Sequence, residues 1–383
     1  MHKVNYTYRF RLYPNECQKV KLAKHFGVCR FVYNYFLDRR NTLYKTNQKS
    51  STYNQDAAEL TKLKELLPWI YDCNSQALQA ELKFLDGAFN KFFKKQAGFP
   101  KFKSKVRDNQ SVRVPQHLTV EDKKLYFPKF KEGIKINLHR EIEGVIKNAT
   151  VSCNKAGQYY VSICVEKYIL NLKPVHSEVG IDFGISALAT MSNGQLYENI
   201  QPYRTLEKRI RLLSKNHSRK EKGSKNKERS RRRLAKLHQR VADIRKNHLH
   251  QMTRQIINEN QVIAVEDLNA SGMMRNRRLA KSIQDVSFYE LGRQLEYKSA
   301  WYGRQFVKIG RFYPSTKTCS CCAFINQTLT LADREWECPR CKVNHNRDLN
   351  AAINILDEAK RTVGITGLAC GENVRLSLES SSH

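Results

Sequence analysis

Two pairs of cysteines near the C-terminal end constrain the fold more than any other feature of the sequence. Cys319 and Cys322 are separated by two residues, as are Cys338 and Cys341, and 15 residues lie between the pairs. Each Cys-x2-Cys turn can direct two thiolates at one tetrahedral ion, so the spacing predicts a zinc ribbon with one structural Zn²⁺. A redox site is the alternative, which the duplicated motif disfavours. Cys321 could replace a ligand or face outward.

The charge of the chain indicates the kind of partner. The sequence has 68 Lys and Arg against 36 Asp and Glu, a net charge of +32, which predicts a polyanionic partner and nucleic acid first. An anionic membrane is the alternative, but no apolar run approaches the roughly 20 residues that span a bilayer. The N-terminal sequence lacks the apolar core of a signal peptide. The other cysteines are scattered singly, as in a reducing compartment, so we expect a cytoplasmic protein without membrane partners.

The N-terminal half predicts a β domain with a helical insertion. The segment "YTYRFRLYP" alternates like a strand, and helical patterns follow from Pro14 through residue 105, with Asn74 as a helix cap. Residues 111–166 contain short alternating runs typical of a small β-barrel or sandwich. The first strand has no hairpin partner nearby. We therefore expect it to pair with the later strands, which makes the helical block an insertion.

Three acidic residues follow or begin predicted elements of the C-terminal half. Asp182 ends an apolar strand beside glycine, and Glu266 and Asp267 end the strand "QVIAV". Asp348 lies near the start of a helix that we expect to dock on the sheet through its apolar positions, which are Leu349, Ala352, Ile353 and Leu356. Alone, each acid could be a cap, a turn residue or a solvated charge. Strand ends of α/β sheets are where sites form, so the three acids can converge.

A cluster of carboxylates without histidine or cysteine favours hard cations. Two Mg²⁺ ions about 3.5 to 4 Å apart can activate water and stabilise the leaving oxygen of a phosphodiester. In a chain this basic, that chemistry predicts a nuclease or a strand transferase. The zinc ribbon would then be inserted between a strand near "RQFVKIG" and the helix that carries Asp348.

The most basic segment lies between the first two acids. Residues 204–246 contain 18 Lys and Arg against 4 Asp and Glu, with apolar residues at helical spacing on either side of Gly223. We interpret the segment as two helices that follow a phosphate backbone, and its run Arg231, Arg232 and Arg233 as nucleic-acid contacts. A solvated helical hairpin is the alternative. Such contacts position a nucleic acid without reading its sequence.

Taken together, the motifs resemble the TnpB family, transposon-encoded RNA-guided DNA endonucleases related to the type V CRISPR effectors. The resemblance covers nearly the whole chain and includes "YRFRLYPNECQ", "CRFVYNYFL", "GIDFGISALAT", "VEDLNASGM", "STKTCSCC" with "CPRC", "NRDLNAAINI" and "GITGLACGE". It implies Mg²⁺-dependent cleavage of double-stranded DNA next to a short transposon-adjacent motif, directed by a guide RNA from the transposon end. It also implies that Asp182, Glu266 and Asp348 are the catalytic triad, and that the four paired cysteines bind zinc.

The resemblance implies a multidomain α+β fold with a β-barrel wedge domain, a helical recognition insertion, an RNase H-like (RuvC-type) α/β nuclease domain and a zinc ribbon within it. The expected domains are a wedge at 1–12 and 106–172, a recognition domain at 13–105, a nuclease domain at 173–314 and 343–370, the ribbon at 315–342 and a flexible tail at 371–383. We expect one protein chain per guide RNA, at the nucleoid of a prokaryote.

In such a protein base pairing supplies most of the selectivity, and the protein reads only the adjacent motif. Candidates for that role are Gln76 and Gln79, since glutamine can pair with adenine through two hydrogen bonds. Arg30, Tyr33 and Asn34 are further candidates, although these side chains could instead pack or cap helices. Two other functions remain open: a nuclease-inactive RNA-guided repressor, which we expect to lack at least one of the three acids, and a transposase that uses them for strand transfer.

Overall fold

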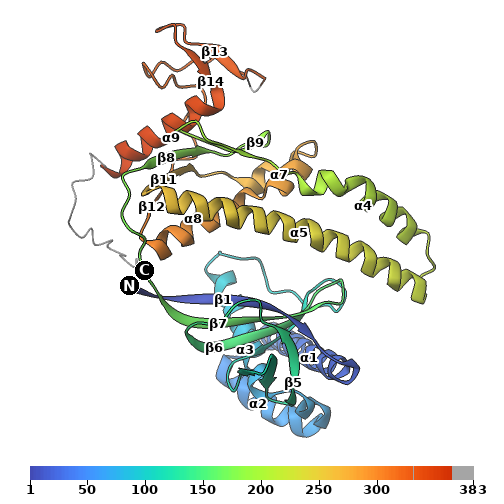
Figure 1. Cartoon of the computed structure of the whole chain (residues 1–383). Helices are drawn as coiled ribbons and strands as arrows, with labels where there is room; N and C mark the ends of the chain where they lie inside the picture. Colours follow the sequence, from blue (N-terminus) through green and yellow to red (C-terminus); the bar gives the residue numbers. More distant parts are fainter. Residues whose placement is uncertain (331, 365–383) are drawn as a thin grey trace. The chain divides into compact units, whose positions relative to one another are not determined.

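A computed structural model describes residues 1–330 and 332–364 (Figure 1). The chain forms two compact units, 1–169 with 210–239 and 170–209 with 240–364. The finer five-domain division stays a prediction, and the expected flexible tail at 371–383 lies outside the described residues. Across those described ranges, no helix is long and apolar enough to cross a membrane.

The first unit is built on a seven-stranded antiparallel sheet. β1 (His2–Tyr13) lies at its centre and pairs with β7 (Tyr159–Ile169) on one side and β5 (Phe130–Asn137) on the other. This confirms the predicted pairing of the first strand. The order is completed outward by β6 (Val145–Cys153) and β2 (Gln110–Val114), and by β4 (Lys124–Phe127) and β3 (Thr119–Glu121). No pairing among the described residues joins the edge strands β2 and β3, so the expected barrel or sandwich is here a single sheet.

Three α-helices and one 3₁₀ turn of this unit lie between β1 and β2 in the sequence. They are α1 (Glu16–Asn47), α2 (Tyr53–Leu66), the 3₁₀ turn η1 (Pro68–Asp72) and α3 (Ser75–Phe93). Asn15 begins α1 with a capping box, and Asn74 caps α3 as expected. Apolar residues of α1, among them Leu22 and Phe36, share one buried cluster with the inward side chains of β1. The helical insertion is therefore packed against the sheet that it interrupts.

The second unit contains a five-stranded sheet in the order β10-β9-β8-β11-β12. β8 (Glu178–Asp182), β11 (Val262–Glu266) and β12 (Gln305–Ile309) are parallel. β9 (Ala187–Met191) is antiparallel to β8, and β10 (Leu196–Glu198) to β9. Parallel strands need crossover connections, and helices supply them here.

Helices cover both faces of this sheet, and the alternation of side chains assigns each strand residue to a face. Val262 and Ala264 contact α9 (Arg347–Val363), which lies along the sheet in Figure 1. Ile263 and Val265 belong to the cluster on the other face, with α7 (Ala280–Val286), α8 (Phe288–Tyr302) and the end of α5 (Lys225–Glu259).

The buried faces of two helices differ in part from the prediction. In α9, Ala352 is buried and Leu356 packs on the sheet as expected, whereas Leu349 and Ile353 are only partly buried. The other fully buried apolar side chains are those of Ala351, Ile355 and Ala359. The reason is that α9 packs on the sheet and also, through buried Asn350 and Asn354, on the cysteine segment. In α8, Phe288, Leu291 and Leu295 are buried as expected, whereas Trp301 is half-buried against the Tyr297 ring.

The basic segment forms α4 (Pro202–Ser218) and α5, with Gly223 between them at φ +88°. This confirms two helices joined near Gly223, because a positive φ favours glycine. Short α6 (Ala270–Met273) follows β11, and the hairpin of β13 (Glu335–Glu337) with β14 (Asn344–Asn346) precedes α9.

Gly180 in β8 lets α9 approach the sheet. A Cβ on Gly180 would lie 2.1 Å from the Ala352 carbonyl oxygen and 2.7 Å from the Leu356 nitrogen, both backbone atoms that cannot turn aside. We expect Gly180→Ala to lower the free energy of unfolding by about 3 kcal/mol, as overpacking does. The measurement is the urea midpoint. Gly292→Ala in α8 is the matched control, because nothing lies within 4 Å of its Cβ. Equal midpoints for the two variants would contradict the prediction.

Candidate metal centres and nucleic-acid contacts

The geometry of the sheet brings the three predicted acids together. Asp182 and Glu266 are the last residues of β8 and β11, parallel neighbours in which Ile181 lies beside Val265. Since Gly180 faces α9, Asp182 two residues later points to that face as well, and Glu266 follows Ala264 in the same way. Asp348 lies in the first turn of α9. All three carboxylates therefore lie at one edge of the sheet.

The repulsion among the three acids appears in the pKa of Asp182. Burial, followed by the negative charges of Asp348 and Glu266, raises the pKa of Asp182 to about 7, against the opposing effect of the Arg347 and Arg334 guanidinium groups. Burial and then the Asp267 carboxylate raise the pKa of Glu266. Because Asp182 is buried and is repelled by both other carboxylates, a proton or a cation that neutralises this charge is favoured. Oxygen ligands alone suit a hard divalent cation, so the cluster fits Mg²⁺.

Two arginines that the sequence did not single out contact the cluster. Arg334 Nη1 donates to Asp348 Oδ2 at 3.2 Å, and Arg347 Nη2 donates to Asp348 Oδ1 at 3.1 Å. The Arg334 side chain is more than half exposed, whereas that of Arg347 is mostly buried. The only signal in the sequence was the position of Arg347 next to Asp348, because Arg334 lies 14 residues away. Both guanidinium groups therefore hold the Asp348 carboxylate in place.

Asp267, next to Glu266, is not part of the cluster described above. Its half-exposed carboxylate pairs with Arg311 Nη2, and its backbone oxygen accepts a hydrogen bond from Arg311 Nε. The period of a strand explains the difference, because consecutive side chains point to opposite faces. Of the two acids that end β11, Glu266 is thus the one that follows Val262 and Ala264 toward α9.

We expect divalent-ion binding at the cluster to depend on pH. Because the Asp182 carboxyl has a pKa of about 7, binding a cation at pH 6 should release about one proton, and apparent Mn²⁺ affinity should rise as pH increases to about 7 and then level off. Calorimetry in buffers of different ionisation enthalpy measures this release. Asp267→Asn should keep the rise in affinity toward pH 7, because Asp267 is not among the groups that shift the pKa of Asp182. A flat profile in the wild type would argue against the shift.

The raised pKa of Asp182 also predicts how the stability of the protein changes with pH. An acid whose pKa is raised in the folded state binds its proton more tightly there than in the unfolded chain. The metal-free protein should therefore lose stability as pH rises from about 4 to about 7, the interval between the ordinary and the raised pKa of Asp182. Asp182→Asn should remove that loss.

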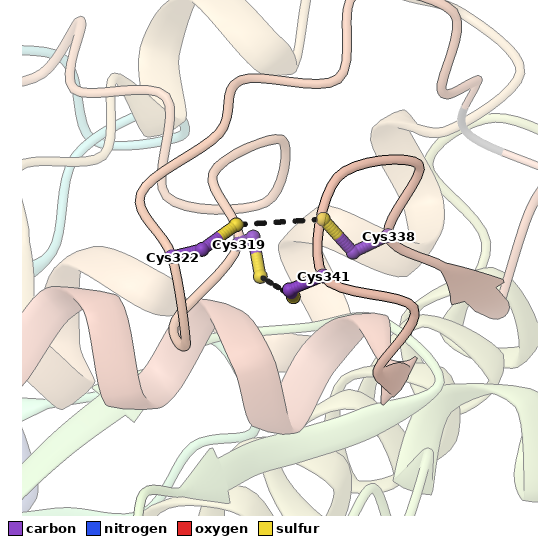
Figure 2. A group of neighbouring side chains, drawn as sticks. All are labelled: Cys319, Cys322, Cys338 and Cys341. Carbon is purple, nitrogen blue, oxygen red and sulfur yellow. Dashed lines mark hydrogen bonds between the residues drawn. The ribbon is translucent and has the colours of Figure 1, made fainter.

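The four cysteines form the second candidate centre. Their Sγ atoms all lie within 4.8 Å of one another, and Figure 2 shows the side chains converging from two loops. The Cys319–Cys341 and Cys322–Cys338 sulfur distances are both 3.6 Å. Tetrahedral Zn²⁺ with bonds of about 2.3 Å separates its sulfurs by about 3.8 Å, so the cluster fits zinc. Cys321 is exposed and lies outside the cluster, which favours the pairing with two-residue spacing.

His345 is a residue of this centre that sequence reasoning missed. Its Nε2 lies 3.0 Å from Cys319 Sγ, and its ring lies against that of Trp336 with centroids 4.8 Å apart. With zinc bound, Cys319 would be a thiolate that accepts hydrogen bonds, and His345 Nε2–H would then be the donor. The residue is 9% exposed. Its only signal in the sequence is a histidine four residues after the last cysteine.

Two of the predicted motif-reading residues are engaged within the first unit. The Asn34 amide donates to the Lys103 carbonyl at 2.9 Å and accepts from the Lys103 N–H at 2.7 Å. Tyr33 is buried, with Lys103 Nζ 4.1 Å from its ring centroid. The packing alternative thus describes both residues in this structure.

The side chains of the other proposed nucleic-acid contacts are half-buried or exposed. Arg30 Nη1 donates to Gln110 Oε1 at 3.0 Å, and Gln76 Nε2 donates to Gln116 Oε1 at 3.0 Å. Gln79 is exposed, and it lies one helical turn after Gln76. All three arginines of the basic run are exposed on α5. Arg231 and Arg232 pair with Glu228, Arg231 also donates to the Lys155 carbonyl, and Arg233 completes the run.

Comparisons with known proteins agree with this architecture. Three family models match the chain: a probable transposase (OrfB_IS605) at residues 162–277, a Cas12f1-like TNB domain at 288–355 and a helix-turn-helix domain at 1–49. A Streptomyces pristinaespiralis protein described as a candidate RNA-guided DNA endonuclease is 36% identical over the whole chain and 94% of its own length. The chain belongs to the TnpB family. A similarly described Escherichia coli relative, InsQ, is 34% identical over 96% of the chain and 94% of its own length.

The fold of this TnpB-family chain also has a counterpart among solved structures. A Cas12f1 protein, determined in complex with sgRNA and target DNA, superimposes with a TM-score of 0.58 at 14% identity, over 92% of this chain and 98% of that one. At this identity the match shows a shared fold. Residues 1–49 form one strand and one long helix, α1, and not the two helices that the name of the third family model suggests.

Proposed function

We propose that this TnpB-family protein is an RNA-guided DNA endonuclease that hydrolyses double-stranded DNA next to a short transposon-adjacent motif. The observation that carries the proposal is the convergence of Asp182, Glu266 and Asp348 at one sheet edge, in a chain of net charge +32. The relatives described as candidate RNA-guided endonucleases, and the shared fold with Cas12f1, support it.

The proposed roles follow from the geometry. Asp182, Glu266 and Asp348 would hold two Mg²⁺ ions, which supply an activated water and charge neutralisation at the leaving oxygen. The two strand-end carboxylates come from a rigid sheet, and the third from a helix that packs on it, so the ligands are pre-positioned. Arg334 and Arg347 would hold the Asp348 carboxylate in place until cations and the DNA phosphate arrive. Arg334, the more exposed, could then contact that phosphate.

The finer fold assignments belong to the same proposal. The sheet of the first unit corresponds to a wedge domain, α1 to α3 to a recognition domain, the five-stranded sheet to a RuvC-type nuclease domain, and the cysteine segment to a zinc ribbon. Arg231, Arg232 and Arg233 on α5 would bind phosphates of the guide RNA or the heteroduplex. Gln76, Gln79 and Arg30 remain the proposed readers of the adjacent motif. Tyr33 and Asn34 would pack beneath them and hold their helices in place.

The partners are a guide RNA from the transposon end and target double-stranded DNA, with one protein chain per RNA, in the cytoplasm of a prokaryote at the nucleoid. The test is to co-express the chain with its flanking transposon DNA, sequence the RNA that copurifies and challenge the complex with a plasmid library. We expect a discrete RNA and Mg²⁺-dependent cleavage next to one motif. Guided binding without cleavage would favour the repressor, and joined transposon-end products would favour the strand transferase.

A further inference from the structure

The four-cysteine segment and the first turn of α9 are connected by hydrogen bonds that a zinc ribbon does not itself require. We propose that Asn350 and His345 are positioning residues that make the placement of Asp348 depend on the metal ion held by the cysteines. The inference rests on the proposed function, in which Asp348 is a ligand of the catalytic cations.

Asn350 holds the backbone on both sides of a cysteine. Its Nδ2 donates to the Thr318 carbonyl at 2.7 Å, and its Oδ1 accepts from the Ser320 N–H at 2.9 Å. Cys319 lies between these two residues. Asn350 is only 2% exposed, so its amide has no water to replace these partners. The position of Cys319 relative to α9 is therefore set by one side chain of α9.

Asn354, one turn later, adds to the same contact. It is 3% exposed and donates to the Ser315 and Thr318 carbonyls at 2.7 and 2.6 Å. Two buried amides thus bind the turn that carries the first cysteine pair. Buried amides and carbonyls lose free energy when their partners move away, so this turn and α9 are expected to move together.

His345 makes a second connection to the same cysteine. Its Nε2 lies 3.0 Å from Cys319 Sγ, and Trp336 packs against the ring. The next residue, Asn346, caps α9 by accepting from the Leu349 N–H at 3.1 Å, and Asp348 lies within the turn that this cap begins. A displacement of the Cys319 sulfur would thus be passed to the cap through the His345 side chain and the peptide bond between His345 and Asn346.

The hairpin before α9 contributes further contacts to Asp348. The Arg347 N–H donates to the Arg334 carbonyl at 2.8 Å, and both arginine side chains bind the Asp348 carboxylate. A bound ion would hold Cys319 next to the other three cysteines and so fix the turn whose backbone binds Asn350. Without an ion this turn could move, and the position of Asp348 would be less well defined. Binding at the two metal sites should then be reciprocally coupled.

The test uses the full chain, zinc-loaded and zinc-depleted, with Mn²⁺ as the probe of the acidic cluster. We expect electron paramagnetic resonance titration to show Mn²⁺ binding about tenfold weaker in the depleted protein, a typical allosteric coupling. In Asn350→Ala, the loaded protein should bind Mn²⁺ as weakly as the depleted one. Its zinc should also pass to a chelator about 10 to 100 times faster, because removing a residue that supports a metal ligand typically weakens metal binding by that factor.

Asn260→Ala is the matched control. Asn260 is also a buried asparagine of the second unit, 1% exposed, but its amide binds Ile256 and Ser177. We expect this variant to keep the zinc release rate and the tenfold ratio. If Asn350→Ala does not fold, His345→Phe tests the same connection, because it keeps a ring against Trp336 and removes the donor to Cys319.

Two outcomes separate this inference from the proposed function. If Mn²⁺ binding requires Asp182 but the loaded-to-depleted ratio is unchanged in both Asn350→Ala and His345→Phe, the coupling is refuted and the nuclease proposal is unaffected. If Asp182→Asn leaves Mn²⁺ affinity unchanged, the acids do not hold cations and the proposed function fails first.

Discussion

Asp182→Asn should reduce guided DNA cleavage by at least about a thousandfold while guide RNA and target DNA still bind. Removing one carboxylate of the cluster leaves cations without a full ligand set, and a thousandfold loss corresponds to about 4 kcal/mol of transition-state stabilisation. Glu266→Gln and Asp348→Asn should each have a similar effect. Because the three act as one site, the triple variant should be little worse than any single one. Single-turnover cleavage with separate measurement of binding tests this.

The control for that result is the carboxylate next to Glu266. Asp267→Asn removes the neighbouring carboxylate at the same strand end, but the Asp267 side chain pairs with Arg311 instead of entering the cluster. We expect cleavage within about threefold of wild type, since exposed ion pairs contribute little. Equal losses for Asp267→Asn and Glu266→Gln would mean that general charge, and not a defined metal site, explains the effect.

The second large effect concerns zinc. Cys338→Ser should leave the purified protein without zinc and its cysteine segment unfolded, because a four-thiolate site of this kind contributes about 10 to 16 kcal/mol of folding free energy. The segment has little else to stabilise it: its buried cluster consists of Cys319, Trp336 and Cys338. Elemental analysis should fall from one zinc per chain to none, and limited proteolysis should cut between residues 315 and 346.

Cys321→Ser is the control for the zinc experiment. Cys321 is exposed and outside the four-sulfur group, although it is adjacent to Cys322. The variant should keep one zinc per chain and the protease resistance of the wild type. Zinc lost from Cys321→Ser and kept in Cys338→Ser would reverse the ligand assignment.

Local rules account for what could be predicted. The spacing of the four cysteines identified the group that converges in Figure 2, because two residues between cysteines is a property of a single turn. Asn15 and Asn74 begin helices because their side chains bond backbone within the next three residues. The alternation in β8 and β11 likewise predicted strands that end in Asp182 and Glu266.

The sequence alone thus determined the elements, the metal-ligand sets and the family resemblance, since each depends on residues close together or on a pattern already known. Only the tertiary structure decided which side chains of α9 are buried, that β2 and β3 do not pair, and that Asn34 is bound to Lys103. It also showed that Asn350 and His345 connect the cysteines to the helix of Asp348. These are contacts between segments distant in the chain or on separate elements, and no periodicity or spacing encodes which buried polar group meets which partner.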